Sequence, residues 1–370
     1  MASVRRYITS SRLASAAALA LALGASSLGS SSAYLVQDLG TLGGTFSWAL
    51  AINGAGEVTG YSTIAGDEAY HAFHFHHGAL EDLAPLPGQP LAQGLAIAPD
   101  GRVAGFSGRL GFGDVPAMFR AVISDRAGVF SDLGVLPGFA DSYAFGVNPR
   151  GQVVGRSCTG VFVTLCRAVR FHPAGGPPDD LGTLGGANSS ASAIDPRGRI
   201  VGDANTAKGR DHAFLLDDRG MHDLGTLGGP DSFALAINND NVVVGFAHPP
   251  GGMDFHAFRM RGASRPGAVM EDLGTLPGDT DSFADAVNDC GEVVGTSNTS
   301  SFTGGTVRPF IFADVRMRDL NELIPADSGW TLDFASAIND AGQIAGMGRI
   351  GGQRHAFLLT PEPELSSCDD

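Results

Sequence analysis

The chain has 370 residues, a formal net charge of −15 at neutral pH, 43% hydrophobic residues and only 17% charged residues. This acidity argues against nucleic acid as a partner, and the single lysine, Lys208, argues against Schiff-base chemistry. The 53 glycines favour many short strands joined by tight turns over a helical fold.

The first 33 residues have the pattern of a secretory signal peptide. Arg5, Arg6 and Arg12 form a basic segment, residues 13–25 are apolar, and small residues lead to a cleavage position at Ala33. This pattern predicts a secreted protein, extracellular or periplasmic, and favours the general secretory route over twin-arginine export. No later segment is apolar enough to predict a membrane span.

From residue 34 onward the chain repeats one unit seven times. The dipeptide Asp-Leu marks each unit, and successive copies lie 43 to 50 residues apart. A period of this length is typical of a supersecondary unit that buries its apolar face against its neighbours. The marking aspartates are Asp38, Asp82, Asp132, Asp180, Asp223, Asp272 and Asp319. We expect each carboxylate to accept backbone N–H groups of the turn that follows it, which is a structural role.

The fifth unit shows the predicted secondary structure most clearly. Residues 232–237, 242–246, 256–260 and 269–273 form four short strands separated by turns. In most units the first turn begins with Asn or Asp and ends with Gly, which is the chemistry of a hairpin. Four antiparallel strands per unit predict an all-β fold, a seven-bladed β-propeller.

The two ends of the repeat array predict how the ring closes. Residues 34–39 resemble a fourth strand with no preceding three, and the last unit stops after its third strand, residues 355–359. The N-terminal strand is therefore expected to complete the last blade and to remove exposed sheet edges. An open β-solenoid is the alternative, although it has no need for this offset. The expected organisation is a signal peptide at 1–33, one propeller at 34–360 and a short acidic tail at 361–370.

The first strands of the units carry small residues on one face and aromatic residues on the other. The small residues are Ala49, Ala144, Ala234 and Ala284, which would let the innermost strands crowd around the axis. The aromatic residues are Trp48, Tyr143, Phe233, Phe283 and Phe334. We expect these rings to form core between blades, with ligand stacking as the alternative.

Two further motifs carry a resemblance to a known family. Asp-Leu-Gly-Thr-Leu-Gly-Gly occurs intact at 38–44, 180–186 and 223–229. His-Ala-Phe occurs at 71–73, 212–214, 256–258 and 355–357. Together with Ile-Asn-x-x-Gly-x-Val-x-Gly, these motifs resemble the HAF-type extracellular repeat of bacteria over residues 34–359. The resemblance implies a secreted or surface-associated bacterial protein, and it implies no reaction because the family is defined by its repeat alone.

The first position of the His-Ala-Phe motif is polar in most units. Its residues are predicted to be His71, Pro116, Arg167, His212, His256, Arg308 and His355. A polar residue at this place predicts a hydrogen bond or a surface contact made in most blades, and the arginines argue against a metal ligand.

The cysteines indicate whether the protein resides in an oxidising compartment. Cys158 and Cys166 flank one loop and are expected to form a disulfide in an oxidising environment, with two unrelated thiols as the alternative. Whether Cys290 and Cys368 pair is left open by the sequence.

Two groups of residues suggest metal binding. His74 and His76 share a strand face and could chelate zinc or copper, although no carboxylate or cysteine nearby in sequence completes the set. Asp279, Asp281 and Asp285 suggest a calcium site, against the simpler interpretation of a solvated acidic turn. Apart from calcium, no cofactor is expected.

Ligand binding is expected on the face where the second-to-third and fourth-to-first connections emerge. Those loops vary most between units, and variable loops on a regular scaffold usually carry the function. Four aromatic residues are candidate contacts there: Tyr61, Phe112, Phe162 and Phe302.

No common catalytic motif is found in the sequence. The prediction is a monomeric, non-enzymatic extracellular propeller that binds a glycan or protein partner or acts as a scaffold. One alternative is an extracellular carbohydrate-active hydrolase or lyase with acids at the central channel. Another is a structural component of the cell envelope that calcium stabilises.

Overall fold

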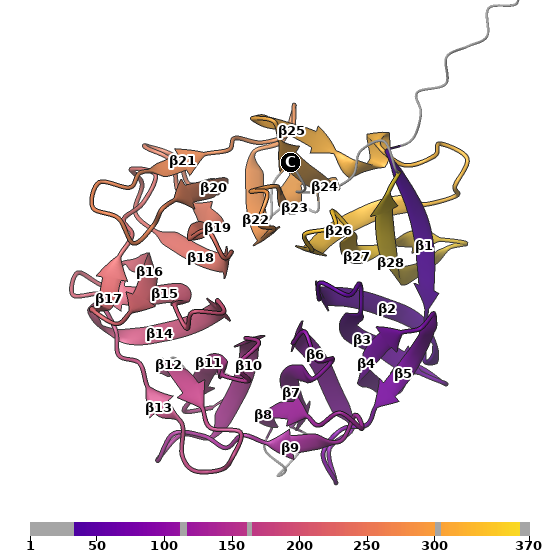
Figure 1. Cartoon of the computed structure of the whole chain (residues 1–370), viewed down its shortest axis with the longest axis horizontal. Helices are drawn as coiled ribbons and strands as arrows, with labels where there is room; N and C mark the ends of the chain where they lie inside the picture. Colours follow the sequence, from indigo (N-terminus) through magenta and orange to yellow (C-terminus); the bar gives the residue numbers. More distant parts are fainter. Residues whose placement is uncertain (1–32, 112–116, 161–164, 300–304, 363–370) are drawn as a thin grey trace, which may run out of the picture. The chain divides into compact units, whose positions relative to one another are not determined.

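The computed structural model describes residues 33–111, 117–160, 165–299 and 305–362. Contacts divide the chain into Met1–Ser31 and Ser32–Asp370, and the described residues all belong to the second unit. Its sheets are arranged around a common centre, as Figure 1 shows. The expected signal peptide therefore lies outside the described residues, apart from Ala33.

The strands repeat in sets of four, each set forming one blade. The innermost strands are β2 (Gly43–Ile52), β6 (Leu91–Ile97), β10 (Asp141–Val147), β14 (Gly185–Ile194), β18 (Ser232–Ile237), β22 (Asp281–Val287) and β26 (Thr331–Ile338). The second strands are β3 (Val58–Ile64), β7 (Val103–Arg109), β11 (Val153–Cys158), β15 (Ile200–Thr206), β19 (Val242–Ala247), β23 (Val293–Asn298) and β27 (Ile344–Ile350). The third strands are β4 (Tyr70–His76), β8 (Met118–Ser124), β12 (Cys166–Phe171), β16 (Asp211–Asp217), β20 (His256–Arg261), β24 (Val307–Ala313) and β28 (Gln353–Pro361). The outer strands are β5 (Ala79–Leu83), β9 (Phe130–Asp132), β13 (Asp179–Asp180), β17 (Gly220–Asp223), β21 (Met270–Asp272), β25 (Arg316–Asp319) and β1 (Tyr34–Gly40).

Blades 1 to 6 follow chain order, from β2–β5 to β22–β25, and blade 7 consists of β26, β27, β28 and β1. β1 is antiparallel to β28, with Tyr34 opposite Pro361 and Asp38 opposite Phe357. A single parallel pairing of Phe46 with Arg354 also joins blades 1 and 7. The predicted seven-bladed propeller, closed by its N-terminal strand, is confirmed (Figure 1).

The apolar core lies between neighbouring blades. One buried cluster contains Ala345 and Leu358 of blade 7 together with Ala49 and Phe73 of blade 1. The phenylalanines of the His-Ala-Phe motif are fully buried in these cores: Phe73, Phe214, Phe258 and Phe357. The repeat therefore encodes the contact between blades as well as the blade itself, as expected for a unit that cannot bury its own apolar face.

Asparagine side chains join successive blades near the axis. The Oδ1 atom of Asn53 accepts the backbone N–H groups of Ala55 and Glu57, as the predicted turn requires. Its Nδ2 group donates to the carbonyl oxygen of Ala98 in blade 2, at 3.2 Å. Equivalent bonds between blades run from Asn148 to Asp195, Asn238 to Asn288, Asn288 to Asn339 and Asn339 to Asn53. The last of these bonds links blade 7 to blade 1 across the closing seam.

The seven aspartates of the Asp-Leu dipeptide form two kinds of structural contact. In six blades the carboxylate accepts a backbone N–H two residues further on, as from Gly40 to Asp38 at 2.7 Å. In all seven blades it also pairs with a cationic or imidazole side chain of the third strand. The pairs are His71–Asp82, Arg120–Asp132, Arg167–Asp180, His212–Asp223, His256–Asp272, Arg308–Asp319 and His355–Asp38.

The assignment of Pro116 to the first position of the His-Ala-Phe motif is wrong. Arg120 pairs with Ser107 in the register in which His71 pairs with Ser62, so Arg120 is the equivalent residue. The loop before the third strand of the second unit is longer than the spacing of the other units predicts, and β8 begins only at Met118. Pro116 lies outside the described residues.

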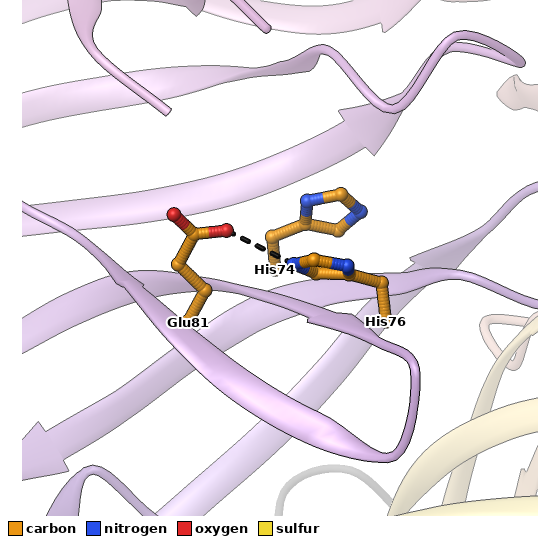
Figure 2. Close-up of side chains that lie close together, drawn as sticks. All are labelled: His74, His76 and Glu81. Carbon is orange, nitrogen blue, oxygen red and sulfur yellow. Dashed lines mark hydrogen bonds and ion pairs between the residues drawn. The ribbon is translucent and has the colours of Figure 1, made fainter. Parts of the chain in front are cut away.

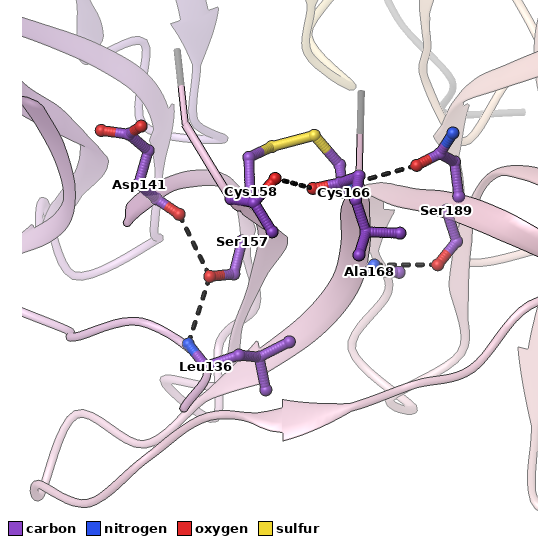
Figure 3. Close-up of a disulfide and its surroundings, with 10 residues drawn as sticks. Leu136, Asp141, Ser157, Cys158, Cys166, Ala168 and Ser189 are labelled. Atoms are coloured by element: carbon purple, nitrogen blue, oxygen red, sulfur yellow. Dashed lines mark hydrogen bonds between the residues drawn. A yellow bond between two sulfur atoms is a disulfide. The ribbon is translucent and has the colours of Figure 1, made fainter. Parts of the chain in front are cut away.

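Cys158 and Cys166 form the predicted disulfide, with an S–S distance of 2.06 Å (Figure 3). The bond joins the adjacent ends of β11 and β12, whose register places the two residues opposite each other. Cys290 is also disulfide-bonded, and Cys368 lies outside the described residues. No helix in the described part of the chain is long and apolar enough to cross a membrane.

Candidate ligand-binding pocket at the propeller axis

The innermost strands place small residues against the neighbouring blade and larger ones toward the axis. Ala49, Ala144, Ala234 and Ala284 are fully buried in the cores between blades. The aromatic residues of the opposite strand face touch neighbouring blades, as Trp48 does with Phe334, but they remain partly exposed. The rings therefore pack between blades as expected, although their partial exposure leaves them outside the fully buried core.

Ten residues enclose a cavity of about 460 Å³ beside the axis, here called the axial pocket. They come from blades 1, 2, 6 and 7 and are Trp48, Leu50, Leu95, Phe283, Asp285, Thr296, Asn298, Val307, Phe334 and Ser336. The innermost strands of these blades border the centre in Figure 1. A mostly apolar cavity of this size with a few polar groups is typical of a site for a small organic molecule.

The aromatic wall of the axial pocket is held in place by contacts between blades 1 and 7. The Trp48 and Phe334 rings lie 4.7 Å apart between centroids, with an angle of 36° between their planes. The Trp48 Nε1 group donates a hydrogen bond to Ser336 Oγ at 3.0 Å. This hydrogen bond fixes the orientation of the indole ring in the wall of the pocket.

Asp285 is the only titratable group among the residues that line the axial pocket. Burial raises its pKa from 3.8 to about 7, and among the described residues no charged group offsets this desolvation. The residue lies at the register shift between Ala284 and Ala286. At this position the other six blades carry Leu50, Leu95, Phe145, Ser192, Leu235 and Ser336. Asp285 is thus the one ionisable residue at this position of the seven blades.

The raised pKa of Asp285 predicts a pH-dependent stability. Between pH 4 and pH 7 the unfolded chain ionises this group while the folded protein keeps it protonated, so folding loses stability as the pH rises. We expect Asp285→Asn to stabilise the protein relative to the wild type by about 2 kcal/mol more at pH 8 than at pH 5. Urea denaturation at the two pH values measures the difference.

The matched control for this prediction is Asp218→Asn, because Asp218 is an exposed carboxylate in the turn between β16 and β17. Its unfolding free energy should follow the wild-type pH dependence. If the unfolding free energies of Asp285→Asn and the wild type changed equally between pH 5 and pH 8, ionisation of the Asp285 carboxyl group would not destabilise the folded protein.

Comparison with known proteins identifies the fold and no family. No family model matches the chain, and no curated protein matches it either. Among solved structures, an oligogalacturonate lyase in complex with manganese aligns with a TM-score of 0.53 at 12% identity, covering 90% of this chain and 95% of the other. TolB from Acinetobacter baumannii aligns with a TM-score of 0.44 at 13% identity, over 86% of this chain and 65% of the other. A putative TolB from Agrobacterium tumefaciens aligns with a TM-score of 0.44 at 15% identity, over 62% and 81%. The likeness to the lyase supports the propeller fold alone.

The candidate aromatic contacts of the variable loops are placed only in part. Tyr61 belongs to strand β3 and not to the loop, and its ring packs on Phe46, Trp48 and Tyr70. Burial raises its pKa to about 12, and the ring supports the aromatic wall from behind. Phe112, Phe162 and Phe302 lie outside the described residues.

The three aspartates of the predicted calcium site do not converge. Asp279 pairs with Arg308 at 2.9 Å, and Asp281 accepts the backbone N–H of Phe255 in blade 5 at 2.9 Å. Asp285 lines the axial pocket instead. The calcium hypothesis for this group is therefore corrected: Asp279 forms an ion pair, Asp281 serves as a structural acceptor, and the strand directs Asp285 toward the axis.

Asp203 also has a strongly raised pKa, and it is not among the candidate residues predicted from the sequence. Asp203 of β15 has its pKa raised to about 7, by burial first and by Asp211 second, while Arg156 opposes the shift. The Arg156 guanidinium lies 5.1 Å from the centroid of the Tyr143 ring. The signal for Asp203 was present, since the residue follows the invariant glycine of the second strand, where most blades carry an uncharged residue.

His74 and His76 come together as predicted, and the structure adds a carboxylate. Their rings stack with centroids 4.5 Å apart, and Glu81 of the neighbouring strand β5 reaches His76 (Figure 2). These three are the one group of potential metal ligands found close together among the described residues. Burial lowers the pKa of His74, which favours its neutral imidazole.

Proposed function

We propose that the protein is an exported, non-enzymatic binding propeller that holds a small organic cation in the axial pocket. The observation that carries the proposal is the combination of three aromatic rings with one carboxyl group that no cation of the described residues neutralises. An ammonium group placed between the rings and the carboxyl group would gain cation–π contacts with the rings. It would also provide the positively charged partner that the Asp285 carboxylate lacks among the described residues. The disulfide between Cys158 and Cys166 and the resemblance to HAF-type repeats support export.

Tryptophan fluorescence tests the proposal, because one of the two tryptophans, Trp48, lines the pocket. Trp330 packs against the buried core near Phe357, so a Trp330→Phe background leaves Trp48 as the only reporter. The probes are choline and its neutral isostere 3,3-dimethylbutan-1-ol. We expect choline to change the Trp48 emission and to bind roughly tenfold more tightly than the alcohol at pH 8.

The role of Asp285 makes the expected binding dependent on pH. Choline affinity should rise as the pH increases through about 7 and then level off, because the ionised carboxylate is the form that attracts the cation. Asp285→Asn should remove the preference for choline over the alcohol, whereas Asp218→Asn should keep it. No fluorescence response to either probe, or equal affinity for both, would refute cation binding in this pocket.

A carbohydrate-active hydrolase or lyase is the second candidate function. The observation in its favour is that Asp203 and Asp285 both have a pKa near 7, which suits a general acid at neutral pH. Release of new reducing ends from a panel of polysaccharides, lost in Asp203→Asn or Asp285→Asn, would favour this function over simple binding.

A further inference from the structure

We propose that His74, His76 and Glu81, with Glu57 as a fourth ligand, bind one divalent transition-metal ion of the zinc class. His74, His76 and Glu81 lie on the outer strands of blade 1 and Glu57 in the turn before β3, and none of the four lines the axial pocket, so the proposal stands apart from ligand binding there. Imidazole and carboxylate donors together favour zinc-like ions over calcium or magnesium.

The register of blade 1 brings the donors together. His74 and His76 are two residues apart on β4, so their side chains lie on the same face of the strand. Glu81 of β5 lies opposite His74 in the sheet. The His76 Nε2 and Glu81 Oε2 atoms are 3.0 Å apart (Figure 2). One ligand atom from each of the three residues lies within 4.8 Å of the others. Metal bonds of about 2 Å would set ligand atoms about 3.3 Å apart, so small side-chain rotations would complete the site.

An unpartnered nitrogen of His74 is a second, independent observation in favour of a bound ion. The His74 Nε2 atom is buried and has no hydrogen-bond partner in the described part of the protein. The nearest acceptor is Glu57 Oε2 at 3.6 Å, which is too long for a hydrogen bond but suits two ligands of one ion. A buried imidazole nitrogen without a partner is costly, and a metal ion would satisfy it.

Neighbouring groups hold the donors in position. The Glu57 carboxylate accepts a hydrogen bond from Asn53 Nδ2 at 2.7 Å, and His77 contacts His76 through their Nδ1 atoms at 3.0 Å. Gly101 of blade 2 covers the group, since a Cβ atom there would lie 3.2 Å from His74 Cε1. Such outer contacts orient metal ligands in known sites.

Comparison with blade 5 shows what blade 1 lacks. At the position of His74, blade 5 carries Arg259, whose guanidinium pairs with Glu271 at 2.9 Å. The same arginine donates to the carbonyl of Gly291, the equivalent of Gly101. Blade 1 keeps the carboxylate of Glu271 as Glu81, gains Glu57 where blade 5 has Val242, and carries imidazoles in place of Arg259 and Arg261. A divalent ion would supply the positive charge that the guanidinium supplies in blade 5.

The test is titration of the chelator-treated mature protein with zinc chloride alone, followed by calorimetry and thermal melting. We expect one zinc ion to bind per chain and to raise the melting temperature by several degrees, with no effect of calcium. Cobalt(II) should give the visible absorption bands of a four-coordinate site with nitrogen ligands.

His74→Leu and His76→Ala should each abolish the zinc-induced shift and the cobalt bands. Leucine is tolerated at the first position, because blades 4 and 7 carry Leu215 and Leu358 there. His172→Ala removes an exposed histidine that pairs with Asp179, and it should bind zinc as the wild type does. Zinc binding that persists in His74→Leu, or the absence of any zinc-induced shift in the wild type, would overturn the proposal.

Discussion

A protein that begins at residue 41, without strand β1, is expected to lose its cooperative unfolding transition. β1 is the outer strand of blade 7 and buries Tyr34 and Leu39. Its Asp38 also pairs with His355 at 3.0 Å. Removal would leave β28 as an open edge at the seam that closes the ring, and the cost is comparable to the whole stability of a typical domain, about 5–15 kcal/mol. Thermal melting followed by circular dichroism measures the loss.

Reattachment of the strand provides the control for this deletion. Tyr34 lies opposite Pro361, so a copy of residues 34–40 joined to Pro361 by an Asn-Gly turn would form a hairpin in the register of the other blades. This permuted protein should recover cooperative melting. A cooperative melt in the deletion variant itself, at the wild-type temperature, would show that ring closure does not depend on β1.

Gly245→Ala is expected to destabilise the protein by more than about 3 kcal/mol, although it adds one methyl group. A Cβ atom at Gly245 would lie 1.9 Å from the carbonyl oxygen of Phe233 on the innermost strand. Each innermost strand has a register shift that brings its backbone against the second strand at this place. The equivalent glycines meet the same obstacle at 1.9 to 2.0 Å: Gly60, Gly105, Gly155, Gly202, Gly295 and Gly346. Urea denaturation measures the change.

Gly54→Ala is the matched control, because a Cβ atom at Gly54 meets nothing within 4 Å and its backbone is not in the left-handed region. Its unfolding free energy should stay within about 1 kcal/mol of the wild type. If Gly245→Ala were as mild as this control, the close approach of the two strands would not limit the residue at that position.

Local features explain why the architecture could be predicted from the sequence. The four strands of blade 5 match residues 232–237, 242–246, 256–260 and 269–273 closely, because alternating side chains and Asn–Gly turns act over a few residues. The closure by β1 followed from counting strands at the two ends of the array. The disulfide followed from two cysteines on either side of one hairpin loop.

The candidate sites depended on contacts that a local pattern does not contain. Alternation showed two faces on each innermost strand, but it could not show that the aromatic face stays partly open at the axis, where Trp48 and Phe334 line the axial pocket. Glu57 and Glu81 lie 17 and 7 residues from His74 in the chain, and only the strand register brings them near it.

The sequence by itself determined the number of blades, their strands, their turns and the closure of the ring, because each of these follows from interactions repeated in every unit. Only the tertiary structure decided which of the residues that differ between units come together in space. Phe283, Asp285, Trp48 and Phe334 meet at one pocket because blades 6, 7 and 1 are neighbours around the axis. Convergence of single residues from different units depends on the closed ring, and the repeat pattern of the sequence does not predict it.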